Sequence, residues 1–287
     1  MAISSETVKN LREKTGAGMM DCKRALEATG GDMEKAIEYL RKRGAATAEK
    51  RADRVANQGI VVTKVGDGGK LGVIVEINSE TDFVARSQDF ITFANDVTAI
   101  VEQKRPTSID ELLSLPYGPG RKVSDALTDL IGKIGEKIAI KRFDIIVAND
   151  SVIEAYTHMG SKIGVLVELG TATKSAEAKT VARDVAMQTA AMNPSVVLRE
   201  HITKDVVDRE LDIYRQQAKN EGKPEPVIER IATGRLDKYF QEVVLLEQSF
   251  IKDASKSIKE VLHEMSSKLN DTLIVRQFKR YQLGDDK

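Results

Sequence analysis

The chain has 287 residues, a length that favours two or three domains over a single core. Lysine plus arginine and aspartate plus glutamate number 44 each, which removes the chain-wide basic excess typical of proteins that bind nucleic-acid backbones. A single cysteine, Cys22, argues against an intramolecular disulfide or a thiolate zinc cluster, and no signal peptide or apolar run of about 18 residues points to secretion or a membrane span.

The first fifty residues predict a small bundle of three short amphipathic helices. Glycine turns at residues 16–18 and 30–31 separate these helices. Asp32 is placed to cap the third helix, which we expect to end at Gly44. The charged, alanine-rich residues 45–58 then indicate a polar helical linker with a solvated face.

Arg12, Met19 and Met20 are the surface candidates of this bundle. Two adjacent methionines cannot both face one core, so one of them is available for an interface. The alternative is that both are partly buried. A dinucleotide-binding loop at residues 16–18 is disfavoured, because no strand precedes it and the third glycine is missing.

Residues 60–101 predict a β-hairpin, a loop and a helix. The hairpin turns at residues 66–69, and its second strand contains the apolar run 71–75. Residues 90–101 have the apolar spacing of a helix. The loop between strand and helix holds four candidate site residues, which are Thr81, Asp82, Phe83 and Val84.

This strand, loop and helix recur later in the chain. Gly72 matches Gly164, which lies 92 residues later, whereas Asp96 matches Asp184, which lies only 88 residues later. The first copy therefore has four extra residues, and they fall within the connection that holds residues 81–84. Because loops on a rigid frame carry function, we expect this elaborated connection to be the functional one.

Further helices and strands complete the two copies. The first copy continues with a short helix that a capping box opens at Ser108 and that ends near Pro116, a helix at 123–131 and a strand at 138–147. The second copy has strands at 152–158 and 163–169 and a helix that Asn193 and Pro194 terminate. Amphipathic helices at 236–246 and 257–269 and a strand at 272–275 follow.

A helical hairpin is predicted within the second copy. From Thr203 onward, Val207, Leu211, Tyr214 and Ala218 have the 4, 3, 4 spacing of a coiled-coil seam. Residues 222–224 (GKP) reverse the chain. The outer faces of both helices are charged, so we expect the hairpin to project from the body.

Catalytic chemistry finds little basis in the sequence. The three histidines, His158, His201 and His263, lie far apart and none has metal-ligand spacing with another ligand. Glu80 and Asp82 are the best carboxylate pair, but they lack a pocket and a second reacting group. We therefore expect neither an enzyme nor a cofactor or metal site.

Phe83 is unusual because it lies in a polar loop. One interpretation is an anchor that folds back onto the core, which is the commoner fate of a loop phenylalanine. The other is an aromatic wedge presented to a partner, with Asp82 beside it to compete for a charged group or to perturb a metal site.

Five segments of the chain, taken together, form a specific pattern. They are residues 11–23 (LREKTGAGMMDCK), 81–86 (TDFVAR), 163–168 (IGVLVE), 222–224 (GKP) and 234–236 (GRL). With these segments the chain closely resembles the translation elongation factor Ts family, from the first helix to about Phe278.

The resemblance implies an α+β fold in three parts. These are a three-helix ubiquitin-associated-like domain with its linker at 1–54, a core N-subdomain at 55–148, and a core C-subdomain at 149–287 with an inserted antiparallel coiled-coil hairpin at about 203–234. It also implies guanine-nucleotide exchange on elongation factor Tu in the cytoplasm, without covalent chemistry. Binding to the GDP-bound and nucleotide-free partner is expected, and binding to membranes or nucleic acid is not.

The resemblance further implies roles for individual residues. Asp82 and Phe83, flanked by Thr81 and Val84, would insert between helices of the partner's GTPase domain, displace its magnesium-holding elements and disturb its phosphate loop. Arg12, Met19 and Met20 would face the same domain. His158 would contact the partner's third domain; the alternative is that it is an ordinary surface turn residue.

Two other functions stay open at this point. An RNA- or ribosome-binding accessory protein would need basic residues interleaved with stacking aromatics, for which Lys279, Arg280 and Tyr281 are the only indication. A ubiquitin-type adaptor would depend on the N-terminal bundle alone and would leave the repeats unexplained. Some members of the family have a further C-terminal helical module, whereas this sequence stops at residues 284–287, so whether its C-terminus contacts the partner stays open.

Overall fold

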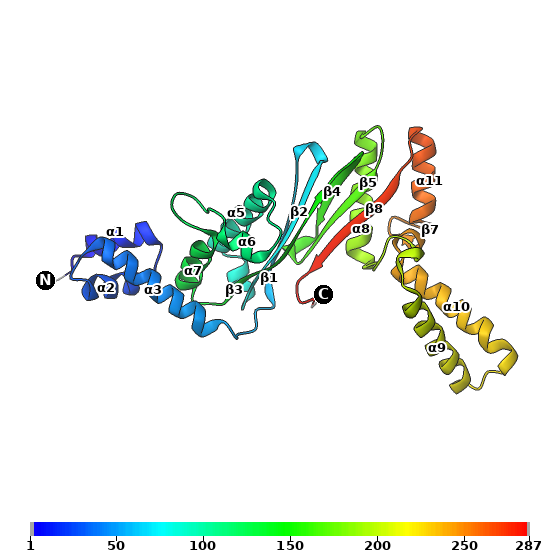
Figure 1. Cartoon of the computed structure of the whole chain (residues 1–287), viewed down its shortest axis with the longest axis horizontal. Helices are drawn as coiled ribbons and strands as arrows, with labels where there is room; N and C mark the ends of the chain where they lie inside the picture. The colour runs from blue at the N-terminus through cyan, green and yellow to red at the C-terminus, as the bar shows by residue number, and fades with distance from the viewer. Residues whose placement is uncertain (1–2, 286–287) are drawn as a thin grey trace.

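The computed structural model describes residues 3–285, apart from the side chain of Met159, and the chain is elongated (Figure 1). Three helices form the N-terminal end, two three-stranded sheets with their helices form the middle, and a helical hairpin projects beyond them. The predicted mixed α+β fold is confirmed. Within residues 3–285, none of the helices combines the length and the hydropathy that a membrane crossing requires.

The N-terminal helices are α1 (Ser5–Thr15), α2 (Met19–Ala28) and α3 (Met33–Arg51). Their apolar sides meet in a small core around Leu11, Cys22 and Leu26, which are fully buried. Asp32 caps α3 as predicted, because its carboxylate accepts a hydrogen bond from the backbone N–H of Lys35 at 3.0 Å.

Helix α3 does not end at Gly44, as the sequence predicted, but continues to Arg51. Gly44 is buried where α3 crosses α7 (Val123–Ile134), and a Cβ atom on Gly44 would lie 3.3 Å from the carbonyl oxygen of Thr128. The glycine therefore serves a close helix crossing and not a C-cap. Residues 45–51, expected in a linker, belong to the helix.

The first repeat forms an antiparallel sheet in the order β1-β2-β3. Its elements are β1 (Gln58–Gly66), β2 (Leu71–Ser79), α4 (Asp82–Ala85), α5 (Gln88–Lys104), α6 (Ile109–Ser114), α7 and β3 (Ile138–Val147). Alternate residues of β2, including Val73 and Val75, pack against α5 and α7. The capping box predicted at Ser108 is only half formed, because the carboxylate of Glu111 accepts hydrogen bonds from Thr107 instead.

The second repeat has the same layout, in the order β4-β5-β8. Its elements are β4 (Ser151–Thr157), β5 (Ile163–Gly170), α8 (Ala176–Met192), α9 (Lys204–Asn220), α10 (Glu225–Val243), β6 (Ser249–Phe250), β7 (Asp253–Ser257), α11 (Ile258–Leu269) and β8 (Ile274–Gln282). The last strand was expected at 272–275 and runs instead to Gln282. The sequence did not predict the full length of this strand, because the strand contains charged residues whose ion-pair partners lie far along the chain. Arg276 pairs with Glu168, and Lys279 pairs with Asp144.

The helices and strands that the two repeats share follow the same order along the chain. Strand β5 begins 92 residues after β2, whereas α8 begins 88 residues after α5. The difference equals the four residues of α4, which lies in the longer connection. Helices α7 and α11 both have 12 residues. In the second repeat, α9 and α10 are inserted between α8 and α11.

A shared apolar layer joins the two sheets on the faces that the helices leave free. It consists of Val61, Ile74, Ile146, Ile153, Leu166 and Tyr281. Two glycines on the central strands permit the close approach. A Cβ atom on Gly72 would lie 2.7 Å from Ile153 Cγ2, and one on Gly164 would lie 2.5 Å from Val61 Cγ1.

Helices α9 and α10 pack against each other as a hairpin that extends away from the sheets (Figure 1). Ala218, Ile228 and Ala232 are buried between them. Ion pairs join Arg215 to Glu229 and tie the two helices together on the outside. Helix α10 continues past residue 234 to Val243, and the coiled-coil packing of the pair remains a prediction.

Candidate partner-binding site

The connection between β2 and α5 is anchored at its base by Thr81. The backbone N–H and the hydroxyl of Thr81 donate hydrogen bonds to the carboxylate of Glu136, at 3.0 and 2.8 Å. The same hydroxyl oxygen caps α4, because it accepts a hydrogen bond from the backbone N–H of Val84. These bonds fix the turn that carries Asp82 and Phe83.

Glu80, the residue before this turn, faces inward, and its side chain is 14% exposed. Its carboxylate accepts hydrogen bonds from the backbone N–H of Lys137 at 2.7 Å and from the guanidinium groups of Arg51 at 2.7 Å and Arg54 at 3.2 Å. The Lys137 N–H, assisted by the two guanidinium groups, holds the pKa of Glu80 below its usual value. Glu80 is therefore an ion-pair partner within the fold and does not form an acid–base pair with Asp82.

Phe83 projects into solvent. It is 84% exposed, more than any other large apolar residue in the described part of the chain. The next two residues provide the inward anchor instead, because Val84 packs against the first core and Ala85 is buried. Asp82 is partly exposed and forms an ion pair with Arg86 at 2.9 Å. The interpretation of Phe83 as an anchor that folds back onto the core is therefore wrong, and its role as a wedge stays a prediction.

Arg12, Met19 and Met20 are all exposed on the N-terminal helices. Met19 is 46% and Met20 62% exposed, so neither methionine fills the core of the N-terminal helices. Glycine supplies this geometry, since Gly16 ends α1 with a φ of 67° and lets α2 start at Met19 after a short turn. The two methionines can therefore be offered to a partner.

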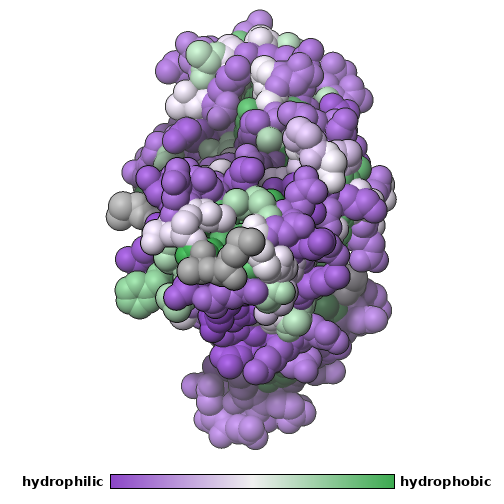
Figure 2. Space-filling model, turned by 90° about the vertical axis from the view of Figure 1, so that its left-hand side faces the viewer, coloured by the Kyte–Doolittle hydropathy of each residue, from purple (hydrophilic) through white to green (hydrophobic). Residues whose placement is uncertain are grey.

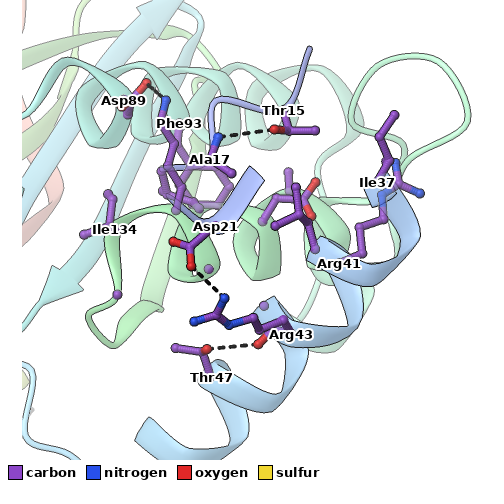
Figure 3. Close-up of a pocket in the computed structure, with 18 of the residues that line it drawn as sticks. Thr15, Ala17, Asp21, Ile37, Arg41, Arg43, Thr47, Asp89, Phe93 and Ile134 are labelled. Atoms are coloured by element: carbon purple, nitrogen blue, oxygen red, sulfur yellow. Dashed lines mark hydrogen bonds and ion pairs between the residues drawn. The ribbon is translucent and has the colours of Figure 1, made fainter. Parts of the chain in front are cut away.

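A cleft of about 630 Å³ lies between these helices and the first repeat (Figure 3). Two ion pairs line it. Arg43 binds Asp21 at 2.6 Å, and Lys133 binds Asp89 at 2.8 Å. A Cβ atom on Gly16 would lie 2.9 Å from the Lys133 ammonium, so the turn between α1 and α2 approaches α7 here. The Arg43–Asp21 pair lies within the N-terminal helices and the Lys133–Asp89 pair lies within the first repeat, so neither of them joins the two parts.

His158 lies on the second repeat, in the turn between β4 and β5. It is exposed, and its Nδ1 atom lies 2.9 Å from the hydroxyl of Tyr156. The two rings are tilted against each other with centroids 6.0 Å apart. The structure therefore brings Arg12, Met19 and Met20 to the end occupied by the first repeat and leaves His158 on the other repeat.

The segment that suggested RNA binding is turned inward. Tyr281 is 6% exposed, its hydroxyl donates a hydrogen bond to Asp144 at 2.9 Å, and the guanidinium of Arg142 lies 4.2 Å from its ring centroid. The side chain of Arg280 is 8% exposed. This aromatic ring offers no free face on which a base could stack.

Glu136 and Arg51 were not predicted as site residues from the sequence. Glu136 follows Gly135, whose φ of 79° ends α7, and it meets Thr81 across 55 positions of the chain. A contact of this kind leaves no local pattern in the sequence. Within residues 3–285, no three or more histidine, cysteine or acidic side chains gather in a way that could hold a metal ion.

Figure 2 shows the end of the molecule that carries the N-terminal helices. Its surface is largely hydrophilic, and hydrophobic residues occur singly or in small groups. A partner that binds this end would meet individual apolar side chains within a charged surface.

Comparisons with known proteins agree with one another. A family model described as "Elongation factor TS" matches residues 80–285. A protein named Elongation factor Ts from Chloroherpeton thalassium is 51% identical over 286 residues, which cover 99% of both chains. Proteins of the same name from Chlorobium phaeobacteroides and Prosthecochloris aestuarii are 47% and 48% identical over 285 residues, which cover 98% of this chain and 99% of theirs.

Proposed function

The chain belongs to the elongation factor Ts family, and from this premise we propose that it is a guanine-nucleotide exchange factor for elongation factor Tu in translation elongation. It would act in the cytoplasm on the GDP-bound partner and pass through a nucleotide-free complex. It would make and break no covalent bond, and it would need no cofactor, membrane or nucleic acid.

The observation that carries this proposal is the exposure of Phe83 on a turn that hydrogen bonds of Thr81 hold in place. In the proposed mechanism, Asp82 and Phe83, flanked by Thr81 and Val84, insert between helices of the partner's GTPase domain and displace the elements that hold magnesium. Magnesium neutralises charge on the β-phosphate, so its loss weakens the binding of GDP. Because the coupling between two ligands is reciprocal, an incoming nucleotide expels the factor in turn.

The magnitude of the effect calls for more than one contact. A thousandfold acceleration of GDP release requires the barrier to fall by about 4 kcal/mol, at roughly 1.4 kcal/mol per tenfold. Burial of a phenylalanine side chain contributes only about 1.5–3 kcal/mol. We therefore propose that Arg12, Met19 and Met20 contact the GTPase domain and that His158 contacts the third domain of the partner.

The domain organisation belongs to the same proposal. The parts are a ubiquitin-associated-like domain with linker at 1–54, an N-subdomain at 55–148, and a C-subdomain at 149–287 with a coiled-coil hairpin at about 203–234. Residues 1, 2, 286 and 287 of these ranges lie outside the described part of the chain. The packing of α1 to α3 and the projection of α9 with α10 support the assignment.

The test is the release of a fluorescent GDP analogue from purified elongation factor Tu in magnesium buffer, with a catalytic amount of this protein. We expect strong acceleration. A folded sample that leaves the release rate of a cognate partner unchanged would overturn the proposal and leave a binding role at the ribosome to be pursued.

The double variant Asp82→Ala with Phe83→Ala locates the activity. Because Phe83 is exposed, the variant should melt within about 2 °C of the parent protein, as surface substitutions usually do, and should lose most of the acceleration. Ile251→Ala, which truncates a 42% exposed residue on the second repeat, serves as the matched control and should keep full activity. A double variant that melts well below the parent would mean that Phe83 stabilises the fold, contrary to the proposed role.

A further inference from the structure

We propose that α3 is a rigid strut that fixes the N-terminal helices relative to the Phe83 turn, with Gly44, Gly132 and Glu80 as its positioning residues. This inference depends on the proposed function, because it explains how two separate surfaces of the chain bind one partner at the same time. The strut has two attachments to the first repeat, one in its middle and one at its end.

The first attachment is the crossing of α3 and α7 at two glycines. A Cβ atom on Gly132 would lie 2.9 Å from the Cα atom of Gly44, a distance that Cβ contacts do not reach without a backbone shift. In the other direction, a Cβ atom on Gly44 would lie 3.6 Å from Gly132 Cα. Neither glycine has a positive φ, so close approach is the reason for glycine at both positions. Backbone contact of this kind leaves little freedom for the helices to slide or separate.

The second attachment lies at the C-terminal end of α3. Arg51 donates a hydrogen bond to Oε1 and Arg54 to Oε2 of the Glu80 carboxylate, and the backbone N–H of Lys137 also donates to Oε1. The Lys137 ammonium in turn donates hydrogen bonds to the carbonyl oxygens of Ala52 and Arg54, at 2.6 and 2.8 Å. The end of the helix is thus held from two sides at the residue that immediately precedes Thr81, Asp82 and Phe83.

The N-terminal helices also approach the first repeat at the turn of Gly16, where a Cβ atom would lie 2.9 Å from the ammonium at the end of the Lys133 side chain. The cleft of about 630 Å³ lies beside the crossing, whose two glycines line it, and the Lys133–Asp89 pair in it lies within the first repeat (Figure 3). A long, partly exposed lysine side chain fixes orientation weakly. The position of Arg12, Met19 and Met20 relative to Phe83 therefore depends on the crossing and on Glu80.

A graded pair of substitutions tests the crossing. In Gly44→Ala the new Cβ atom would lie 3.3 Å from the Thr128 carbonyl oxygen, so the helices should shift slightly. In Gly132→Ala it would lie 2.9 Å from Gly44 Cα, so the helices should shift more. Gly234→Ala is the matched control, since Gly234 lies within α10 and a Cβ atom there would meet nothing within 4 Å. All three variants add the same methyl group to a helical glycine.

The activity measurement separates positioning from folding. We expect Gly132→Ala to raise the concentration needed for half-maximal exchange roughly tenfold or more, because a misplacement of about 1 Å has effects of that order. Gly44→Ala should raise it less, and the maximal rate at saturation should change by less than about twofold in both. Gly234→Ala should leave both quantities unchanged.

A distance measurement tests the strut without reference to exchange. Spin labels on Lys23→Cys in α2 and Lys104→Cys in α5 report the separation of the two parts, since both lysines are exposed and the native Cys22 is buried. We expect one narrow distance distribution in the parent and in Gly234→Ala, and a shifted or broadened one in Gly132→Ala. Should Gly132→Ala not fold, Gly44→Ala supplies the same comparison.

The outcomes distinguish the two proposals. A broad distribution in the parent, or an unshifted distribution in both crossing variants, would overturn the strut. A shifted distribution with unchanged half-maximal concentration would also overturn it, because the position of the helices would then not matter. If the parent chain fails to accelerate GDP release at all, the proposed function falls, while the distance measurement still decides whether α3 is rigid.

Discussion

Glu80 and Phe83 lie three residues apart and face opposite ways. Glu80 is held by three donors, and hydrogen bonds to a charged group contribute about 1.5–3 kcal/mol each. Phe83 makes no comparable contribution to the fold, because most of its surface is in water. The partly buried charge of Glu80 therefore stabilises the base of the turn, and the exposed ring of Phe83 is free to be used by a partner.

The substitution Glu80→Gln should lower the free energy of unfolding by about 2 kcal/mol at pH 7, because the amide keeps one acceptor oxygen but loses the charge. The pKa of Glu80 is lowered in the folded protein. Its contribution is therefore complete above the pKa of the unfolded chain, about 4.3, and is lost as the pH falls through the lower pKa of the folded chain. Urea unfolding of both proteins between pH 7 and pH 3 measures this difference.

Glu200→Gln, which changes an exposed glutamate outside the junction, provides the control and should be close to neutral at every pH. The difference between the parent and Glu80→Gln should be constant above about pH 5 and should shrink below it. A difference that does not change with pH would show that the charge of Glu80 is not what holds the end of α3.

At the scale of elements, the sequence predicted what depends on local pattern. The strand at 138–147 was predicted with its observed ends, because the run of apolar residues that marks it is local to the sequence. The end of α3 was missed, because only the contact of Gly44 with Gly132, far along the chain, explains that glycine. The length of β8 was missed for a similar reason, since its pairing with β5 and its ion pairs decide where it ends.

The candidate site, likewise, was predicted from the sequence only in part. The four extra residues were visible in the sequence and correctly located the α4 turn. The direction of Phe83 was not visible, because it depends on Val84 and Ala85 filling the core and on Glu136 holding Thr81. Local sequence identified the position of the turn, and contacts distant in sequence determine how it is presented.

The glycines at the sheet interface form a reciprocal pair. Gly72 accommodates Ile153, and Gly164 accommodates Val61. In the repeat register, Gly164 corresponds to Gly72 and Ile153 to Val61, with the same spacing of 92 residues. Each sheet therefore inserts an equivalent β-branched side chain over the glycine of the other, and the approach of the two sheets depends on the absence of a side chain at both positions.

Gly164→Ala should destabilise the protein by about 2 kcal/mol, because the new methyl group would lie 2.5 Å from Val61 Cγ1 and overpack the layer. Val61→Ala should relieve part of this strain, because Thr63 Cγ2, which would lie 2.9 Å from the same methyl group, stays in place. In a double-mutant cycle measured by chemical denaturation, we expect the two changes to be coupled by at least about 1 kcal/mol. Val185→Ala in α8, which belongs to the other side of the sheet, should combine additively with Gly164→Ala; additivity with Val61→Ala as well would contradict the interlocking arrangement.

At the scale of the whole molecule, both repeats use one carboxylate to hold the connection after their central strand. In the first repeat Glu136 binds Thr81, and in the second Asp271 accepts hydrogen bonds from Thr171 and Thr173. The Thr171 hydroxyl and the Thr173 N–H hold the pKa of Asp271 far below its usual value. Hydrogen bonds to a carboxylate thus hold the connection in both repeats. Only the first connection contains the additional turn α4, from which Phe83 projects.

Because the two sheets share one apolar layer, we expect them to unfold as one cooperative unit, while the tip of the α9 and α10 hairpin opens separately. In native-state hydrogen exchange, amides of β2 and β5 should then report the same free energy of opening, and amides near Gly222 a much smaller one. Gly164→Ala should lower the protection of β2 and β5 by equal amounts and leave α9 unchanged. If β5 alone lost protection, the two repeats would unfold independently. The proposed boundary between residues 148 and 149 would then also separate two units with different free energies of opening.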